Sequence, residues 1–195
     1  MRKMLAFAMM IALCGCDNLT IRGDKPIPGL PSIPTVEQPA QNSCPMPSNI
    51  QWDVRFSPNG GATSHLVEQL GQAKQSIYVQ AYSFTSQPIA DALVAAKARG
   101  VHVEVILDRS DKGGKGTMLP VLTSNVITVY LDEKHAIAHN KIMIVDKHIV
   151  FTGSFNFTSA AEHSNAENSL ELIDTKIAEV YQNNWDVHKG HSVLQ

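Results

Sequence analysis

The chain has 195 residues, of which 44% are hydrophobic and 17% are charged, and its formal net charge is −2. This length suits one domain of about 100–200 residues with additional segments. The composition excludes a long disordered or collagen-like chain. The near-neutral charge also excludes the strongly basic surface of a protein that coats DNA.

The first 16 residues have the pattern of an export signal. Arg2 and Lys3 precede an apolar run from Met4 to Leu13, which is shorter than the about 20 residues that span a bilayer. The end of this segment resembles a bacterial lipoprotein signal, in which Cys16 becomes the acylated first residue. We therefore expect an exported, periplasmic protein that is anchored to a membrane through Cys16. The alternatives are an ordinary cleaved signal and an uncleaved N-terminal anchor.

Residues 17–48 have the composition of a spacer. They hold seven of the ten prolines of the chain, which favours extended and semi-rigid conformations with little surface to bury. The folded domain is then expected at residues 49–195. A domain of this size can bury enough surface to form a core of its own.

Hydrophobic patterning predicts alternating strands and helices in the first half of this domain. A strand at 52–56 is followed by a helix capped by Thr63. A second helix is capped by Ser86, with Pro88 in its first turn, and Gly100 ends it. Further strands are expected at 76–84, 101–107 and 126–131.

The second half of the domain is expected to pair its strands directly. Strands at 141–146 and 148–152 flank Lys147 as a tight pair, and another strand follows at 169–173. A helix at 175–188 closes the domain. Together the two halves predict an α/β sandwich in which helices flank a mixed β-sheet.

Residues able to perform chemistry are concentrated near the tight strand pair. His139 and Lys141 lie two positions apart in an extended segment, so their side chains point to the same face. The imidazole offers a nucleophile or a proton carrier, and the ammonium group offers positive charge to a phosphoryl group. Ser154 and Asn156 add a hydroxyl and an amide that can bind phosphate oxygens. A carboxylate such as Glu167 can hold one imidazole nitrogen and leave the other free for attack.

The pattern HxKxxxxDxxxxxxGSxN over these residues resembles the signature of the phospholipase D superfamily, the HKD motif. The similarity extends to the surrounding elements over about residues 50–190. By size and single motif, the chain is most similar to small endonucleases of bacteria and plasmids, with a mitochondrial-surface member as a relative. The resemblance implies a phospholipase D-like fold and cleavage of phosphodiesters without a metal or other cofactor.

The resemblance also implies a role for each motif residue. His139 is the nucleophile that forms a phosphohistidine, and Glu167 orients it. Lys141 and Asn156 hold the phosphate, with support from Ser154. The two remaining motif positions, for which we expect a structural role, are Asp146 and Gly153.

A single HKD motif has a consequence for assembly. The family mechanism uses two such histidines, one to attack and one to protonate the leaving oxygen. His-x-Lys occurs once in this chain, at His139. The second histidine must then come from another subunit, and we expect a homodimer with its active site at the two-fold interface.

Other signals in the sequence carry less weight. Residues 111–117 lack the spacing of a nucleotide-binding loop, which leaves Lys112 and Lys115 as candidates for contacts with a substrate backbone. His135 and His139 are four residues apart but lack the glutamate of a zinc-binding HExxH helix, so no metal is expected there. Tyr82 and Phe84 alternate on a strand and are expected in the core and at its rim.

These observations predict a metal-independent endonuclease of low specificity that acts on DNA or RNA. The first alternative is the same chemistry on phospholipid headgroups, by hydrolysis or transfer, which a membrane anchor brings within reach. The second alternative is a non-catalytic binding protein of the cell envelope. The complete set of motif residues argues against this last alternative.

Overall fold

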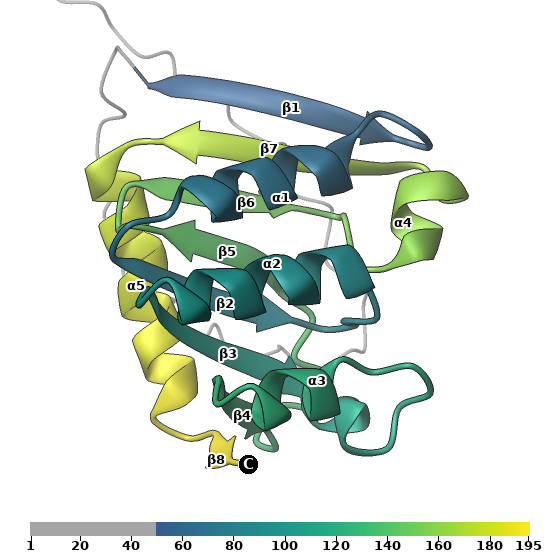
Figure 1. The fold of residues 1–195 in the computed structure, drawn as a ribbon, viewed down its shortest axis with the longest axis vertical. Helices are drawn as coiled ribbons and strands as arrows, with labels where there is room; N and C mark the ends of the chain where they lie inside the picture. The colour runs from purple at the N-terminus through teal and green to yellow at the C-terminus, as the bar shows by residue number, and fades with distance from the viewer. Residues whose placement is uncertain (1–49) are drawn as a thin grey trace, which may run out of the picture. The chain divides into compact units, whose positions relative to one another are not determined.

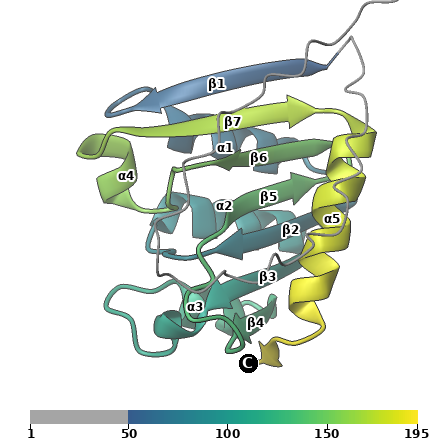
Figure 2. The ribbon, with the colours of Figure 1, turned by 180° about the vertical axis from the view of Figure 1, so that it is seen from behind.

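The computed structural model describes residues 50–195, so the export signal, Cys16 and the proline-rich spacer lie outside the described residues. The described chain forms one eight-stranded mixed sheet with helices on both faces (Figures 1 and 2). The strand order is β1-β7-β6-β5-β2-β3-β4-β8. The predicted α/β architecture with a mixed sheet is therefore confirmed.

The elements follow the predicted alternation and add short ones that the sequence patterns did not indicate. In chain order they are β1 (Gln51–Ser57), α1 (Ala62–Gln72), β2 (Ser76–Ala81), α2 (Gln87–Ala98), β3 (His102–Asp108), the 3-10 helix η1 (Arg109–Lys112), α3 (Leu119–Ser124), β4 (Thr128–Asp132), β5 (Lys141–Val145), β6 (Ile149–Gly153), α4 (Ser159–His163), β7 (Glu167–Ile173), α5 (Thr175–Lys189) and β8 (Val193–Leu194). Within residues 50–195, the helices are too short or too polar to span a bilayer.

Strand directions place several chain segments at one edge of the sheet. β2, β3 and β4 run parallel, whereas β5 runs antiparallel to β2 with Ala81 opposite Lys141. β6 and β7 continue the antiparallel pairing beyond β5. The carboxyl ends of β2, β3, β4 and β6 therefore meet the amino ends of β5 and β7 at the same edge.

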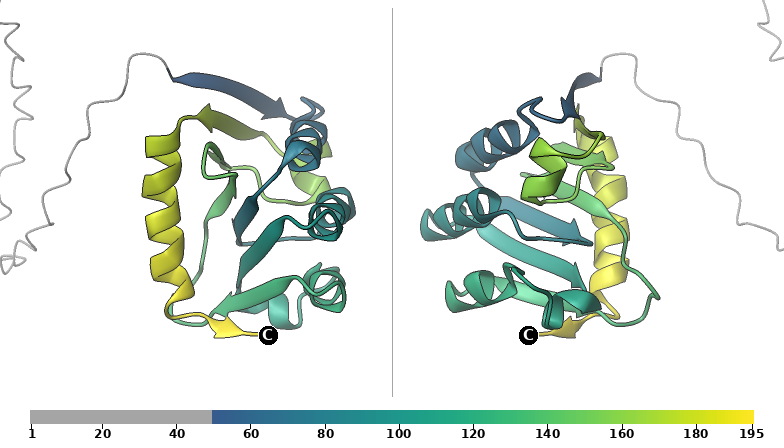
Figure 3. Two further views of the ribbon diagram at one scale, coloured as in Figure 1. Left: turned by 60° about the vertical axis from the view of Figure 1, so that its left-hand side comes forward. Right: turned by 90° about the vertical axis from the view of Figure 1, so that its right-hand side faces the viewer.

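Helices cover the two faces of the sheet unequally. α1, α2 and α3 lie on one face and α5 lies alone on the other (Figure 3). The larger core lies beneath the first group and includes Leu66, Leu70 and Leu93. On the other face, Trp185 of α5 is buried, and its indole nitrogen donates a hydrogen bond to the carbonyl oxygen of Val79 at 2.9 Å. Burial on both faces explains why the central strands are continuously apolar.

The start of α1 differs from the predicted cap. The helix begins after Gly61, and no side chain of its own terminus caps it, so the assignment of this role to Thr63 is wrong. The carboxylate of Glu162 in α4 accepts hydrogen bonds from the amides of Gly61 at 3.0 Å and Thr63 at 2.7 Å. A glutamate 99 residues away therefore supplies the acceptor that a local cap provides in most helices.

Asp146 joins the tight strand pair to the rest of the sheet. Asp146 and Lys147 have φ angles of 51° and 52°, as the two central residues of a type I′ turn require, and the amide of His148 closes this turn on the carbonyl oxygen of Val145 at 3.0 Å. The Asp146 carboxylate accepts hydrogen bonds from the amides of Lys74, Gln75 and Ser76 at 2.7–3.0 Å. Burial opposes ionisation, but these amides outweigh it and hold the pKa of Asp146 below its usual value. The motif aspartate thus contacts the α1–β2 connection.

Candidate active site

The predicted catalytic and phosphate-binding residues, together with Gly153, come together in one open cleft at the edge of the sheet, whereas Asp146 lies apart from it. The cleft has a volume of about 560 Å³. It lies where β5 begins, β6 ends and β7 begins, as the antiparallel pairing of these strands requires. The lining residues are His139, Lys141, Gly153, Ser154, Asn156, Glu167 and Asn168.

Lys141 provides a cation that is largely shielded from water. Its side chain lies at the first position of β5, and the residue is only 7% exposed. The ammonium group donates a hydrogen bond to the carbonyl oxygen of His139 at 2.7 Å and lies 5.1 Å from the ring centroid of Tyr82. Burial lowers the pKa of Lys141, and the nearby Glu167 carboxylate opposes this effect. A cation in such surroundings interacts with a phosphate more strongly than one in bulk water.

His139 is exposed at the mouth of the cleft. It lies on the connection between β4 and β5, two residues before Lys141, where β5 begins. Its ring centroid is 4.7 Å from that of Tyr82, and the amide of Tyr82 donates a hydrogen bond to the carbonyl oxygen of Asn140 at 3.0 Å. The imidazole is thus supported on one side and open to a substrate on the other.

Gly153 and Ser154 form a close backbone contact with the start of β7. The amides of Ser154 and Phe155 both donate to the carbonyl oxygen of Asn168 at 3.1 Å, and the amide of Asn168 donates to the Ser154 hydroxyl at 3.1 Å. At Gly153, φ is 138° and a Cβ would collide with the Asn168 carbonyl oxygen, so only glycine fits. Because the hydroxyl accepts from Asn168, its own proton is available to a phosphate oxygen.

Asn156 and Glu167 complete the lining of the cleft. The Asn156 side-chain oxygen is buried and has no hydrogen-bond partner among the described residues. Glu167 accepts a hydrogen bond from the side-chain amide of Asn165 at 3.0 Å. Within residues 50–195, no hydrogen bond joins Glu167 to His139, so the orienting role stays a prediction.

Two residues of the site were not singled out by the sequence. Tyr82 was expected in the core or at its rim, and the structure places it against His139 and Lys141, whereas Phe84 is fully buried. Asn168 follows Glu167 directly and braces Ser154. The available signal is the place of Tyr82 directly after the apolar strand β2, whose last residue, Ala81, pairs with Lys141.

Tyr82 also lines a second, smaller hollow of about 210 Å³. Lys115 lines this hollow and Lys112 does not. Asp111 also lines it and is nearly buried, and burial raises its pKa to about 6, assisted by the charge of Asp108 and opposed by a hydrogen bond from Thr117. The hollow extends the polar surface of the site beyond the phosphate-binding residues.

Known protein sequences are similar to this chain over most of the described residues. Residues 66–188 match the family described as "Cardiolipin synthase, PLD-like domain". Phospholipase D of Rickettsia conorii is 45% identical over 130 residues, which cover 67% of this chain and 65% of that protein. Mitochondrial cardiolipin hydrolase of Xenopus laevis is 32% identical over 161 residues, 83% of this chain and 72% of that protein. The chain thus spans just under two thirds of the rickettsial relative.

Solved structures show the same fold. Nuc from Salmonella typhimurium, a phospholipase D family member, superposes with a TM-score of 0.72 and 35% identity, covering 75% of this chain and 99% of that one. NucT from Helicobacter pylori superposes with a TM-score of 0.69 and 25% identity, covering 74% and 99%. The chain therefore belongs to the phospholipase D superfamily. Its sequence contains one HKD motif.

Proposed function

We propose that this protein is a nuclease of low specificity that cleaves the phosphodiester backbone of DNA or RNA. The observation that carries the proposal is the placement of an exposed imidazole, His139, beside the shielded cation of Lys141 and the polar groups of Ser154 and Asn156 in one cleft. This set provides a nucleophile and preorganised donors for the negative charge on the phosphoryl oxygens.

The reaction would proceed in two displacements. In the first, an imidazole nitrogen of His139 attacks phosphorus, and the bond to the leaving alcohol oxygen breaks. That oxygen takes a proton from His139 of the partner subunit. In the second, water attacks the phosphohistidine and gives its proton to the same partner histidine, which releases the phosphate monoester and restores both imidazoles. Lys141 holds the phosphate oxygens during both steps.

A homodimer follows from this scheme, because one chain supplies one HKD histidine. His139 is exposed and its cleft is open, so the imidazole is accessible to a second subunit. A two-fold axis beside the cleft would bring two equivalent histidines to one phosphate.

Two features support nucleic acid as the substrate. The cleft is lined only by polar residues and glycine, which suit a phosphate backbone. Tyr82 also lines the neighbouring hollow, which adds the hydroxyls of Ser83 and Ser110 and the ammonium group of Lys115 beside the Asp111 carboxyl group. A polar surface of this extent suits a substrate that continues beyond the cleaved bond.

Hydrolysis of phospholipid headgroups is the second candidate. The relatives named phospholipase D and mitochondrial cardiolipin hydrolase favour it. Ile137 also favours it, because this side chain is 56% exposed two residues before His139 and could enter a lipid surface.

One experiment separates the candidates. Purified wild type and His139→Ala are incubated with DNA, RNA, and vesicles of phosphatidylcholine or cardiolipin, all with chelator. We expect cleavage of DNA or RNA and a loss of at least about 10³-fold in His139→Ala, because the nucleophile is gone. His148→Ala, which removes another exposed histidine, should keep full activity. Cleavage of lipid alone would establish the second candidate, and binding without turnover would indicate the non-catalytic protein.

We further propose that the N-terminal segment exports the protein to the periplasm and that acylated Cys16 anchors it to a membrane. The basic start and the short apolar run of residues 1–16 support this proposal. Labelled palmitate should enter the wild type and not Cys16→Ser. Recovery of both proteins in the soluble fraction would contradict the anchor.

A further inference from the structure

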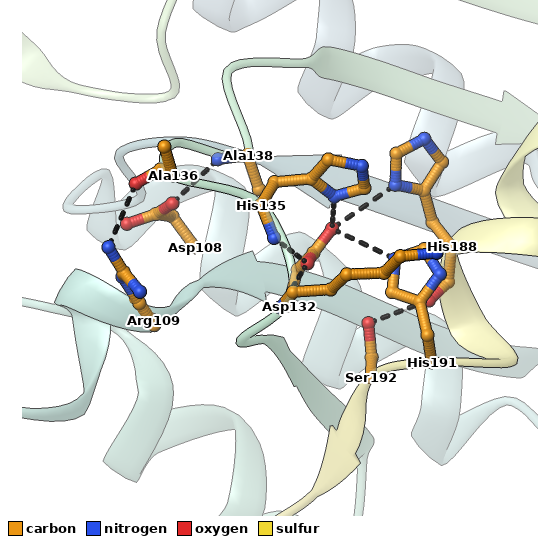
Figure 4. A network of polar contacts seen from close by, with 10 residues as sticks. Asp108, Arg109, Asp132, His135, Ala136, Ala138, His188, His191 and Ser192 are labelled. Carbon is orange, nitrogen blue, oxygen red and sulfur yellow. Dashed lines mark hydrogen bonds and ion pairs between the residues drawn. The ribbon is translucent and has the colours of Figure 1, made fainter.

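Three histidine side chains converge on one carboxylate oxygen at the end of β4 (Figure 4). The Oδ2 atom of Asp132 lies 2.8 Å from Nδ1 of His135, 3.1 Å from Nδ1 of His188 and 3.4 Å from Nε2 of His191. The sequence spacing pairs His135 with His139, whereas the structure brings His135 to the C-terminal histidines. None of these four residues lines the active-site cleft.

Hydrogen bonding alone does not account for this cluster. The other carboxylate oxygen, Oδ1, already accepts hydrogen bonds from the amides of Lys134 at 3.1 Å and His135 at 3.2 Å. The two oxygens of a carboxylate offer about four lone-pair sites. Five nitrogens surround Asp132, and three of them face the single oxygen Oδ2. The backbone contacts to Oδ1 fix the carboxylate in the orientation that presents Oδ2 to the imidazoles.

The same four atoms have the arrangement of a metal-binding site. Each residue offers one ligand atom, and these atoms all lie within 4.8 Å of one another. Tetrahedral zinc with bonds of about 2.0–2.1 Å separates its ligand atoms by about 3.3 Å. Three imidazoles and one carboxylate are ligands that zinc accepts, and Asp-x-x-His and His-x-x-His are short spacings that suit a shared ion.

We propose that Asp132, His135, His188 and His191 bind a Zn²⁺ ion in a structural site. Four protein ligands fill the tetrahedral coordination shell, which is the pattern of a structural rather than a catalytic zinc. The Asp132 side chain is fully buried, and those of His188 and His191 are 16% and 18% exposed. The His135 side chain, at 41%, leaves a route for the ion from solvent.

The location suggests what the ion does. Asp132 ends β4, His135 lies on the β4–β5 connection, and His188 and His191 flank the end of α5. β8 follows directly and pairs with β4 at the edge of the sheet. One ion would therefore fasten the C-terminal segment to the connection that leads to His139. It takes no part in the proposed reaction.

Metal binding is tested with the full chain after removal of bound metal by chelator and dialysis. Zn²⁺ and Co²⁺ are the probes. We expect one ion per chain, visible d–d absorption of tetrahedral Co²⁺, and a Zn²⁺-dependent rise in Tm of about 5 °C or more. The double variant His188→Gln/His191→Gln should bind at least about 100-fold more weakly and lose the Co²⁺ spectrum.

Two further variants separate loss of ligands from loss of folding. His135→Gln changes the most exposed ligand and should fold normally while it weakens binding. His148→Gln removes an exposed histidine outside the cluster and should bind as the wild type does. Absence of a Co²⁺ spectrum and of a Tm shift in the wild type would overturn the proposal. An affinity unchanged by the double variant would also overturn it, because the ion would then lie elsewhere in the chain.

Discussion

At the scale of single residues, Lys141 has surroundings that another cation does not reproduce. Its ammonium group donates a hydrogen bond to the His139 carbonyl oxygen at 2.7 Å and lies 5.1 Å from the centroid of the Tyr82 ring. An ammonium group is a compact point charge, whereas a guanidinium is planar and holds its donors in a fixed fork. Arginine at this position would therefore meet the same partners with a different geometry.

Substitution of Lys141 should affect catalysis more than stability. We expect Lys141→Gln and Lys141→Arg each to lower kcat/KM by about 10²-fold or more, with Tm little changed for Lys141→Gln. Lys147→Gln is the matched control, because Lys147 is exposed in the β5–β6 turn. Full activity in Lys141→Arg would show that charge alone is sufficient.

Asp111 should make stability depend on pH. Its folded pKa of about 6 exceeds the ordinary value of 3.8, so the folded state favours the protonated acid. The chain is therefore stabilised at low pH and loses this contribution as pH rises from about 4 to above 6. A shift of about 2 pH units corresponds to at most about 3 kcal/mol.

Asp111→Asn removes the charge and should remove this dependence. We expect the variant to unfold at higher denaturant concentration than wild type at pH 8, and at a similar concentration at pH 4. Chemical denaturation across this range provides the measurement. An equal effect of Asp111→Asn at both pH values would contradict the raised pKa.

At the scale of elements, α1 depends on a residue far away in the chain. The Glu162 carboxylate accepts hydrogen bonds from the amides of Gly61 and Thr63 at the start of this helix. Burial opposes its ionisation, but the hydrogen bonds with Thr63 and Gly61 outweigh it and hold the pKa of Glu162 below its usual value. Its contribution is therefore present above about pH 4.5 and declines as the pH falls through the lower, folded-state pKa.

Glu162→Ala should lower the free energy of unfolding at pH 7 by about 2 kcal/mol, because two amides of α1 lose a charged acceptor. Glu68→Ala is the control, since Glu68 is exposed on the same helix. Urea denaturation at pH 7 measures both variants. A loss equal to that of Glu68→Ala would show that water replaces the carboxylate.

The elements also show which parts of the fold the sequence could predict. The strands and long helices carry periodic or continuous apolar patterns, and the structure has them close to the expected positions. The cap of α1 and the brief β8 depend on partners remote in sequence, and no local pattern encodes those. The same holds for the functional residues. The HKD spacing indicated the residues that line the cleft. The contact of Asn168 with Ser154 and the grouping of Asp132 with His188 and His191 arise only from tertiary structure.

At the scale of the whole molecule, the proposed homodimer predicts how subunits cooperate. Wild type and His139→Ala are mixed in equal amounts under conditions that allow subunit exchange. If each site needs both histidines, only the wild-type homodimers are active, and the mixture keeps about a quarter of the activity of the same amount of wild type. If the subunits acted independently, the mixture would keep about half of that activity, and this result would contradict the shared site. Sedimentation of the mixture verifies that dimers have formed.

The direction of β1 sets how the domain meets the chain that precedes it. Gln51, where the described domain begins its first strand, pairs with Ile173, whereas Ser57 at the other end pairs with Glu167 of the cleft. Seven residues of strand span about 23 Å. The N-terminal attachment point and the catalytic cleft thus lie at opposite ends of β1. If Cys16 anchors the protein as proposed, tension on the N-terminus would act on the Gln51 end of β1 and not on the Ser57 end beside the cleft. The strand would then separate the attachment point from the proposed site of catalysis.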